Sequence, residues 1–390
     1  KNLQDYHLVV YADGTPIEML IPVNLTDGKD TSRVYGKKEY KGHPWVQREE
    51  LPYDITQGLQ GRHLCLWASH GKYYNNRAQK WIWQRPRLFC TTEDLFTQTI
   101  VVPYAIRMLE NAGACVFTPR DRDWQKNEAI VDNDAPEAGG IYQETNGKYA
   151  WNEGGTGFAY RQAYYQDGDN PFMDGSCRVI ESVTGRKEPS TALWCPVVPE
   201  DGDYAVYVSY RTFPNSVDDA RYIVRHQGID TPFTVNQRMG GGTWVYLGTF
   251  RFDAGDLNNN CVILTNQSSS RGLVSADAVR LGGGMSNIVR SDSTMSYALA
   301  SGLPRFLEAA RYSAPWYGFP LETYCVKDND DYGDDINVRS RTENHLGRGS
   351  IYLPGDSGLC VPIELSMGIH SDAGFRRDSS IVGTLGIYTA

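Results

Sequence analysis

Residues 136–284 consist of short strand-like runs separated by turns, and this pattern constrains the fold more than any other feature of the chain. Runs such as "DYAVYVSYR", "TWVYLGTFRF" and "CVILTN" are separated by Gly, Asn, Asp and Ser, which favour turns. Tyr204, Val206, Val208 and Tyr210 alternate with other residues, so they are expected to share one face of a strand. The segment is therefore predicted to be an antiparallel β-sandwich.

Residues 61–123 show a different pattern, in which two short apolar runs flank a helix-like segment. The runs "HLCLWAS" and "ACVFTP" are predicted to be buried strands. Between them, "TTEDLFTQTIVVPYAIRMLENAG" has Thr91 or Thr92 as candidate N-cap and Gly113 as C-terminal stop, and Pro103 is expected to bend the helix. Strand, helix and strand in this order predict a parallel pair with a helical crossover.

The same character returns after the sandwich segment. We expect a helix in "SYALASGLPRFLEAARYSA", an exposed acidic loop in "DNDDYGDD" and a final strand in "IELSMGIH". The predicted fold class is therefore α/β: a central, mostly parallel sheet flanked by helices, interrupted by an inserted antiparallel β-sandwich. The expected parts are an N-terminal extension or small subdomain (1–60), the first part of the α/β domain (61–135), the sandwich (136–285) and the second part of the α/β domain, expected to be incomplete at its C-terminus (286–390).

Charge and composition exclude two classes of function. The net charge of −9 argues against nucleic-acid binding, because no basic stripe is present to neutralise phosphates. No apolar run approaches the about 20 residues that a transmembrane helix needs. The 25 Tyr, 9 Trp and 39 Gly residues suit β-rich, extracytoplasmic proteins that handle carbohydrate, so we expect a secreted, periplasmic or cell-surface protein.

The eight cysteines lie far apart and form no C-x-x-C pair, which argues against a thiolate zinc site. Several lie within apolar runs, such as Cys65 in "HLCLW" and Cys261 in "CVIL", where a free cysteine behaves as a small apolar residue. We therefore expect mostly free thiols.

Two predicted strands end in the same way, with a histidine followed by small or polar residues. They are "LCLWASHGKYY", with His70, and "LSMGIHSDAGF", with His370. Ligands of parallel sheets gather beyond the carboxyl ends of the strands, and Glu93, near the start of the predicted helix, is expected at the same edge. Each residue alone is more often structural, but two imidazoles and one carboxylate together match a catalytic Zn²⁺ site with one open position.

These segments resemble the zinc-dependent N-acetylmuramoyl-L-alanine amidases. The resemblance rests on "HLCLWASHGKYY", "TTEDLFTQTIVVPYAIRMLENAGACVFTPRDRD" and "LSMGIHSDAG". It implies an amidase-like α/β domain in which His70, Glu93 and His370 are the metal ligands and Zn²⁺ is the cofactor. It also implies peptidoglycan or another glycan as the substrate, and it places the family's arginine-aspartate stretch on Arg120 and Asp121.

The resemblance also leaves gaps. "INVRSRTEN", with Arg339, is similar to the segment before the family's last histidine strand, so Arg339 is expected to orient the site or to tie loops together. Asp372 is a second candidate for site support, although the family commonly has alanine there. The family's catalytic glutamate lies well after its last histidine, whereas no acidic residue follows Asp378 here. The catalytic residue is therefore unknown.

The sandwich segment has a resemblance of its own. "TWVYLGTFRFDAG", "CVILTN" and "VSADAVRL" look like the module at the end of golvesin and in bacterial proteins labelled xanthan-lyase-like. An amidase-like domain split by this module is similar to a group of Bacteroidetes proteins. Trp244 and the tyrosines of the segment are candidates for glycan stacking, although a sandwich core also needs aromatic residues.

Two further motifs resemble known functional sites, but we do not expect either to be functional. "PGDSGLC" contains the Gly-Asp-Ser-Gly of chymotrypsin-like proteases around Ser357, but the chain lacks the matching histidine strand. "DNDDYGDD" lacks the spacing and the terminal glutamate of an EF-hand loop.

The predicted function is zinc-dependent hydrolysis of peptidoglycan or a related amide. Two alternatives remain open: a non-catalytic glycan-binding surface protein with a degenerate amidase scaffold, and a xanthan-lyase-like polysaccharide lyase.

Overall fold

The computed structural model of the chain divides it into two compact units, residues 42–371 and residues 1–41 together with 372–390. The second unit contains, among its described residues, a short antiparallel hairpin of β1 (Tyr11–Ala12) and β2 (Thr15–Pro16). All other elements belong to the first unit. The structure describes residues 9–12, 15–17, 39–49, 58–87, 90–185, 188–290, 300–327, 329–355 and 357–371.

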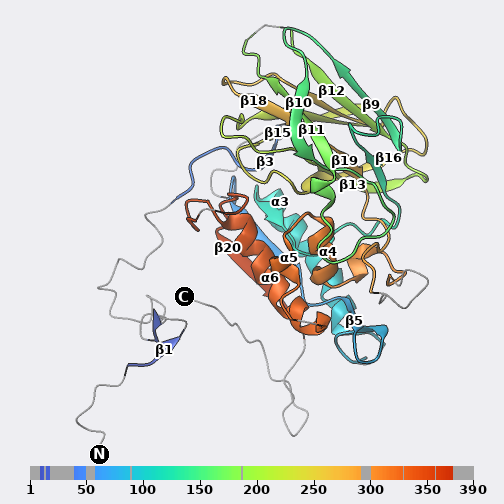
Figure 1. Cartoon of the computed structure of the whole chain (residues 1–390), viewed down its shortest axis with the longest axis vertical. Helices are drawn as coiled ribbons and strands as arrows, with labels where there is room; N and C mark the ends of the chain where they lie inside the picture. The colour runs from blue at the N-terminus through green and yellow to red at the C-terminus, as the bar shows by residue number, and fades with distance from the viewer. Residues whose placement is uncertain are drawn as a thin grey trace, which may run out of the picture. The chain divides into compact units, whose positions relative to one another are not determined.

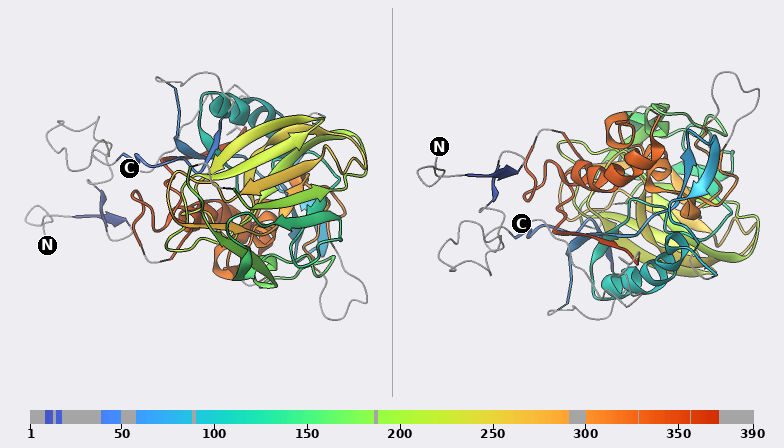
Figure 2. Two further views of the ribbon diagram at one scale, coloured as in Figure 1. Left: turned by 90° about the horizontal axis from the view of Figure 1, so that it is seen from above. Right: turned by 90° about the horizontal axis from the view of Figure 1, so that it is seen from below.

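Antiparallel sheets make up most of the first unit, and most of their strands are labelled in the upper part of Figure 1. The left view of Figure 2 shows them side by side. The six-stranded sheet has the order β3 (Val46–Arg48), β15 (Ile229–Val235), β14 (Ala220–His226), β17 (Cys261–Thr265), β12 (Thr191–Pro196) and β9 (Gly140–Thr145). The four-stranded sheet has the order β16 (Val245–Phe252), β13 (Gly202–Val208), β19 (Val279–Leu281) and β8 (Ala129–Val131). A three-stranded sheet consists of β10 (Asn152–Gly157), β11 (Gly175–Glu181) and β18 (Leu273–Ala276).

The sandwich prediction is confirmed, and β13 is more deeply buried than its alternation suggests. Tyr204, Val206 and Val208 are buried as expected, but so are Ala205 and Tyr207 on the opposite face. β13 lies between β16 and β19, so both of its edges are paired. Its second face is also covered by aromatic residues outside the sheet: the ring of Tyr207 lies 6.3 Å from that of Tyr317.

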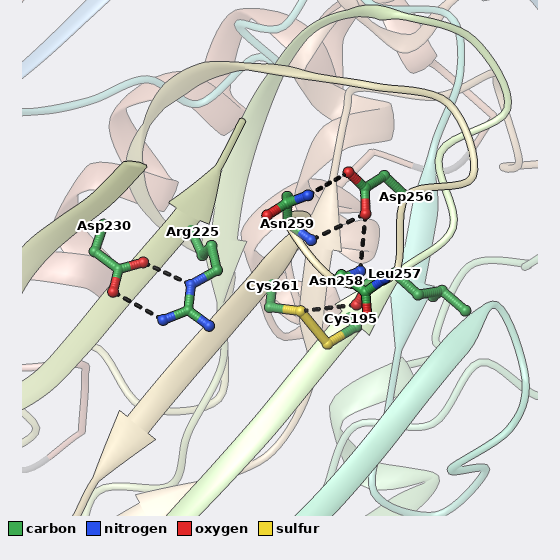
Figure 3. Close-up of a disulfide and its surroundings, with 8 residues drawn as sticks. All are labelled: Cys195, Arg225, Asp230, Asp256, Leu257, Asn258, Asn259 and Cys261. Atoms are coloured by element: carbon green, nitrogen blue, oxygen red, sulfur yellow. Dashed lines mark hydrogen bonds and ion pairs between the residues drawn. A yellow bond between two sulfur atoms is a disulfide. The ribbon is translucent and has the colours of Figure 1, made fainter. Parts of the chain in front are cut away.

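One disulfide joins two neighbouring strands of the six-stranded sheet (Figure 3). Cys195 of β12 bonds to Cys261 of β17, and Trp194 pairs with Val262 in the ladder beside it. The other six cysteines are free, so the expectation of mostly free thiols holds, but the choice of Cys261 as a free one was wrong. The register that brings these two strands together is not visible in the local sequence.

A small parallel sheet positions the candidate site. β4 (His63–Ala68) lies in its centre and runs parallel to both β20 (Leu365–Ile369) and β7 (Cys115–Phe117). The crossover between β4 and β7 contains α1 (Glu93–Phe96), α2 (Gln98–Ile100), the π-helical segment η6 (Val101–Ile106) and α3 (Arg107–Asn111).

The crossover helix packs on this sheet as the sequence predicts. Leu64 and Leu66 of β4 form a buried cluster with Val101 and Ile106 of η6. The π-helical segment includes Pro103, the residue expected to disturb the helix. The strand–helix–strand prediction is therefore confirmed for this part of the chain.

The predicted fold class is nevertheless wrong. The parallel sheet has only three strands among the described residues, whereas the antiparallel sheets dominate the unit. Segments on both sides of the expected α/β core join the antiparallel sheets instead: β3 pairs with β15, and β8 pairs with β19. The central, mostly parallel sheet of an α/β protein is therefore not formed.

The helix predicted in "SYALASGLPRFLEAARYSA" is much shorter than expected. Its described part contains a 3₁₀ turn, η8 (Arg305–Leu307), and then α4 (Ala310–Trp316). Gly302 has a φ of +70°, and Pro304 lacks the N–H that a helix interior needs, so the chain does not enter the helix before Ala310. The remaining described elements are β5 (Lys72–Asn75), β6 (Lys80–Trp83), η7 (Pro171–Met173), α5 (Leu321–Tyr324) and α6 (Asp331–Gly347).

The predicted exposed acidic loop is also wrong, because most of it forms the buried start of α6. Asp331, Asp334 and Asp335 are buried. Arginines from distant segments neutralise this charge: Arg290 Nε lies 2.6 Å from Asp331 Oδ2, and Arg311 Nε lies within 4 Å of both Asp331 and Asp334. These arginines lie outside the acidic segment, so the segment by itself resembles an exposed, solvated loop.

Acid is expected to destabilise the fold through His63, the first residue of β4. The side chain is fully buried and its Nε2 accepts the backbone N–H of Trp45 at 2.9 Å. Burial lowers the pKa of His63 to about 4. Below about pH 6.5 His63 is therefore protonated in the unfolded chain but stays neutral in the folded chain. The free energy of unfolding falls as the pH drops toward 4.

The loss should reach about 2 kcal/mol between pH 7 and pH 5. It can be measured by urea unfolding of metal-stripped protein, with His63→Gln, which keeps an acceptor, as the comparison. The variant should lose about 2 kcal/mol less over that interval. Equal pH dependence of the two proteins would show that His63 is not responsible.

Candidate metal centre

His70 lies just beyond the carboxyl end of β4 and is buried at 3% exposure. The backbone around it is fixed from two sides: Arg120 donates to the His70 carbonyl oxygen, and the Ser69 backbone N–H donates to the Thr97 hydroxyl at 3.3 Å. Gly71 follows, and a Cβ there would lie 2.2 Å from the carbonyl oxygen of Glu308. The glycine after His70 therefore allows a close backbone approach that no other residue would permit.

His370 lies beyond the end of the neighbouring parallel strand. Ile369 of β20 pairs with Ala68 of β4, so the two strands end side by side. The imidazole rings of His70 and His370 are 4.8 Å apart, centroid to centroid. The expectation that both histidines reach one edge of a parallel sheet is confirmed in the three-stranded sheet.

Glu93 brings a carboxylate to the two imidazoles from the first residue of α1. Its Oε1 lies 3.2 Å from His370 Nδ1 and 3.9 Å from His70 Nδ1, and accepts the Ser371 N–H at 3.1 Å. One ligand atom from each of His70, Glu93 and His370 lies within 4.8 Å of the others. We refer to these three residues as the His–Glu–His cluster.

The cluster fits a metal ion better than a set of hydrogen bonds. Glu93 Oε2 is buried and has no hydrogen-bond partner among the described residues. Buried polar atoms are otherwise nearly always satisfied. Two nitrogen donors and one carboxylate oxygen form the ligand set of a catalytic zinc site, in which water or substrate takes the fourth position.

Glu93 is held in its ionised form. Burial favours the neutral acid, but the hydrogen bonds from His370 and the Ser371 N–H, together with the nearby imidazoles, lower the pKa of Glu93 to about 2. The guanidinium of Arg85 adds a positive charge, with its Nε 3.5 Å from Glu93 Oε2. A permanently charged carboxylate is the form that coordinates a metal.

Asp94 and Arg85 are parts of the site that the sequence did not reveal. Asp94 is fully buried, its Oδ1 lies 3.4 Å from His70 Nδ1, and its Oδ2 accepts the backbone N–H of Arg85 at 3.0 Å. A carboxylate beside the second nitrogen of a ligating histidine fixes the orientation of the ring. The sequence feature that could have indicated Asp94 is its position directly after Glu93 at the start of the predicted helix.

The other residues singled out in the sequence lie outside the cluster. Arg339 donates to the carbonyl oxygens of Ser69 and Asp335, so it ties α6 to the segment that ends in His70 and does not touch the cluster. Asp372 lies outside the described residues. Ser357 is exposed in the loop between α6 and β20. The tying role expected for Arg339 thus matches its contacts.

The arginine-aspartate stretch has structural contacts. Arg120 holds the His70 backbone, and Asp121 forms a fully buried ion pair with Arg280 of β19. This stretch therefore fastens the cluster's backbone to the sandwich.

Comparisons with known proteins identify the sandwich. Residues 175–283 match the Golvesin C-terminal domain family. Xanthan lyase of Bacillus sp. (strain GL1) is 34% identical over 96 residues, which is 24% of this chain and 10% of the relative. The chain thus spans about a tenth of the length of this curated relative.

Two solved structures share limited similarity with the chain. Paenibacillus xanthan lyase aligns with a TM-score of 0.30 and 28% identity, covering 40% of this chain and 13% of that one. The C-terminal CBM6 of LamC from Zobellia galactanivorans aligns with a TM-score of 0.24 and 13% identity, covering 40% of this chain and 99% of that one. The resemblance of the sandwich to the golvesin module is confirmed, whereas the amidase resemblance stays a prediction.

Proposed function

We propose that this chain handles a glycan outside the cytoplasm and that its His–Glu–His cluster hydrolyses an amide bond in that glycan, with peptidoglycan as the substrate class. The single observation that carries the hydrolase proposal is the convergence of His70, Glu93 and His370 from three separate segments. Their ligand types match a catalytic zinc site.

The glycan part of the proposal rests on the sandwich. Residues 175–283 match the Golvesin C-terminal domain family, and a curated xanthan lyase is 34% identical over 96 residues. The similarity covers only a tenth of the relative, so it supports a glycan as the ligand class and not lyase chemistry. The peptidoglycan substrate rests on the amidase resemblance of the segments around the cluster.

The residues around the cluster have separable tasks. Zinc held there would polarise a substrate carbonyl and lower the pKa of its bound water to about 7. Arg85 and the Ser371 N–H keep Glu93 ionised and oriented, and Asp94 orients His70. Arg120 holds the backbone of the segment that carries His70.

A glycan-binding protein without catalysis is the second candidate, and one observation favours it. Among the described residues, Glu93 and Asp94 are the only carboxylates within ion-pair distance of either imidazole. Both are engaged in holding the cluster, so the described residues offer no further carboxylate at that distance to act as a general base. The absence of such a base would slow turnover by about 10²–10⁴-fold.

Hydrolysis of purified peptidoglycan tests the proposal directly. The zinc-loaded chain should release free amino groups at L-alanine, and His370→Ala should abolish the release while a histidine outside the cluster, in His226→Asn, should not. Binding of peptidoglycan without released amino groups would favour the second candidate. A product that absorbs in the ultraviolet, as unsaturated uronic acids do, would favour the lyase.

A further inference from the structure

A second group of buried acidic side chains lies inside the sandwich, where β8 and β19 end. Val131 of β8 pairs with Val279 of β19, so Asp132 and Asp277 leave the same end of this strand pair. Asp132 is 4% exposed and Asp277 is 1% exposed. Neither residue belongs to the His–Glu–His cluster.

Asp132 differs from Asp277 because its carboxylate accepts no well-formed hydrogen bond; the backbone N–H groups of Asn133 and Asp134 lie near enough to favour its charged form, but burial outweighs them. Both Oδ atoms of Asp132 are buried without a hydrogen-bond partner among the described residues. Asp277, in contrast, accepts the Phe158 N–H at 3.0 Å and the Ser209 hydroxyl at 2.9 Å. The Oδ1 atom of Asn133, next to Asp132, is a third buried oxygen without a partner.

Among the described residues no basic side chain compensates this pair, although other buried acids have one. Asp121 pairs with Arg280 at 2.5 Å, and Asp331 pairs with Arg290 at 2.6 Å. Among the described residues, no arginine, lysine or histidine lies within ion-pair distance of Asp132. Leaving a buried carboxylate ionised and uncompensated is costly, so the site needs either a proton or a bound cation.

We propose that Asp132, with Asp277 beside it, binds a calcium-type divalent cation at the end of the β8–β19 strand pair. The unpartnered buried donors of Asp132 and Asn133 are all oxygens, which suits a hard cation and not zinc. A cation would tie the ends of the two strands inside the sandwich.

The pKa values of Asp132 and Asp277 are both raised, as expected for buried carboxylates that lack a nearby positive charge. Burial, with the negative charges of Asp277 and Asp134, raises the pKa of Asp132 to about 8. Burial also raises the pKa of Asp277 to about 7. A cation that binds here displaces the proton, so binding should weaken as pH falls below these values.

Terbium luminescence offers a specific probe, because Trp194 lies beside the site. Its indole N–H donates to the Asp277 carbonyl oxygen at 2.9 Å. Tb³⁺ added to the full chain should luminesce on tryptophan excitation, and excess Ca²⁺ should quench the signal by competition. Ca²⁺ should also raise the melting temperature of metal-stripped protein by several degrees, as any ligand of the folded state does.

Three variants decide between a cation and a proton. Asp132→Asn should weaken Tb³⁺ and Ca²⁺ binding at least 100-fold. Asp203→Asn, an exposed acid on β13, and His70→Ala should leave binding unchanged. If the variant does not fold, calorimetric titration of the native chain with Ca²⁺ still decides the question. Absence of Ca²⁺ binding, or binding that survives Asp132→Asn, would overturn the proposal in favour of a protonated Asp132.

Discussion

Replacing His70 by alanine is expected to abolish zinc binding by the chain. In the proposed site His70 is one of three ligands, and the two that remain, Glu93 and His370, would be too few for a site that needs at least three protein donors. The affinity should fall by more than the 10–100-fold that is typical for losing a residue that only supports a ligand. Metal content after dialysis and competition with a chromophoric chelator measure the loss.

Two further variants make this prediction specific. Asp94→Asn keeps the shape of the side chain but removes the charge 3.4 Å from His70 Nδ1, so it should weaken zinc binding by about 10–100-fold. His43→Ala removes an exposed imidazole far from the cluster in sequence and should change nothing. Equal zinc content in wild-type protein and His70→Ala would show that the metal binds elsewhere.

Replacing Asp121 by alanine is expected to destabilise the fold by about 3–5 kcal/mol. Asp121 and Arg280 are both completely buried and their charged atoms lie 2.5 Å apart. Removing the carboxylate leaves the Arg280 guanidinium in the interior, with Glu128, 3.3 Å away, as its remaining ion-pair partner among the described residues. Guanidinium chloride unfolding measures the change in the free energy of unfolding.

Comparison with an exposed ion pair tests this explanation. Arg225 and Asp230 form two short hydrogen bonds on the sandwich surface (Figure 3), and Asp230→Ala should cost less than about 1 kcal/mol. Adding Arg280→Met to Asp121→Ala should recover part of the loss, because no charge is then left buried. Similar losses for Asp121→Ala and Asp230→Ala would contradict the account.

The parts of the site that local sequence predicted are those fixed by strand and helix ends. His70 and His370 follow apolar runs that do form strands, and Glu93 does open a helix. Because parallel strands end at a common edge, local pattern was enough to bring these residues together. Asp94 was missed because its contact with His70 depends on how the imidazole ring is oriented. Residue spacing in the sequence does not predict that orientation.

The fold class could not be predicted because it depends on pairing between distant segments. β3 and β8 look like isolated short runs, and only their partners β15 and β19 reveal that they belong to antiparallel sheets. The same holds for the acidic run at the start of α6. Its burial depends on Arg290 and Arg311, which lie outside the run.

X-ray absorption at the zinc edge of the zinc-loaded chain tests the central claim most directly. The account predicts one zinc per chain with only nitrogen and oxygen neighbours at about 2.0–2.2 Å, including the scattering of two imidazoles, one of which is lost in His370→Ala. A chain that takes up no zinc, or a zinc with sulfur neighbours at about 2.3 Å, would contradict it.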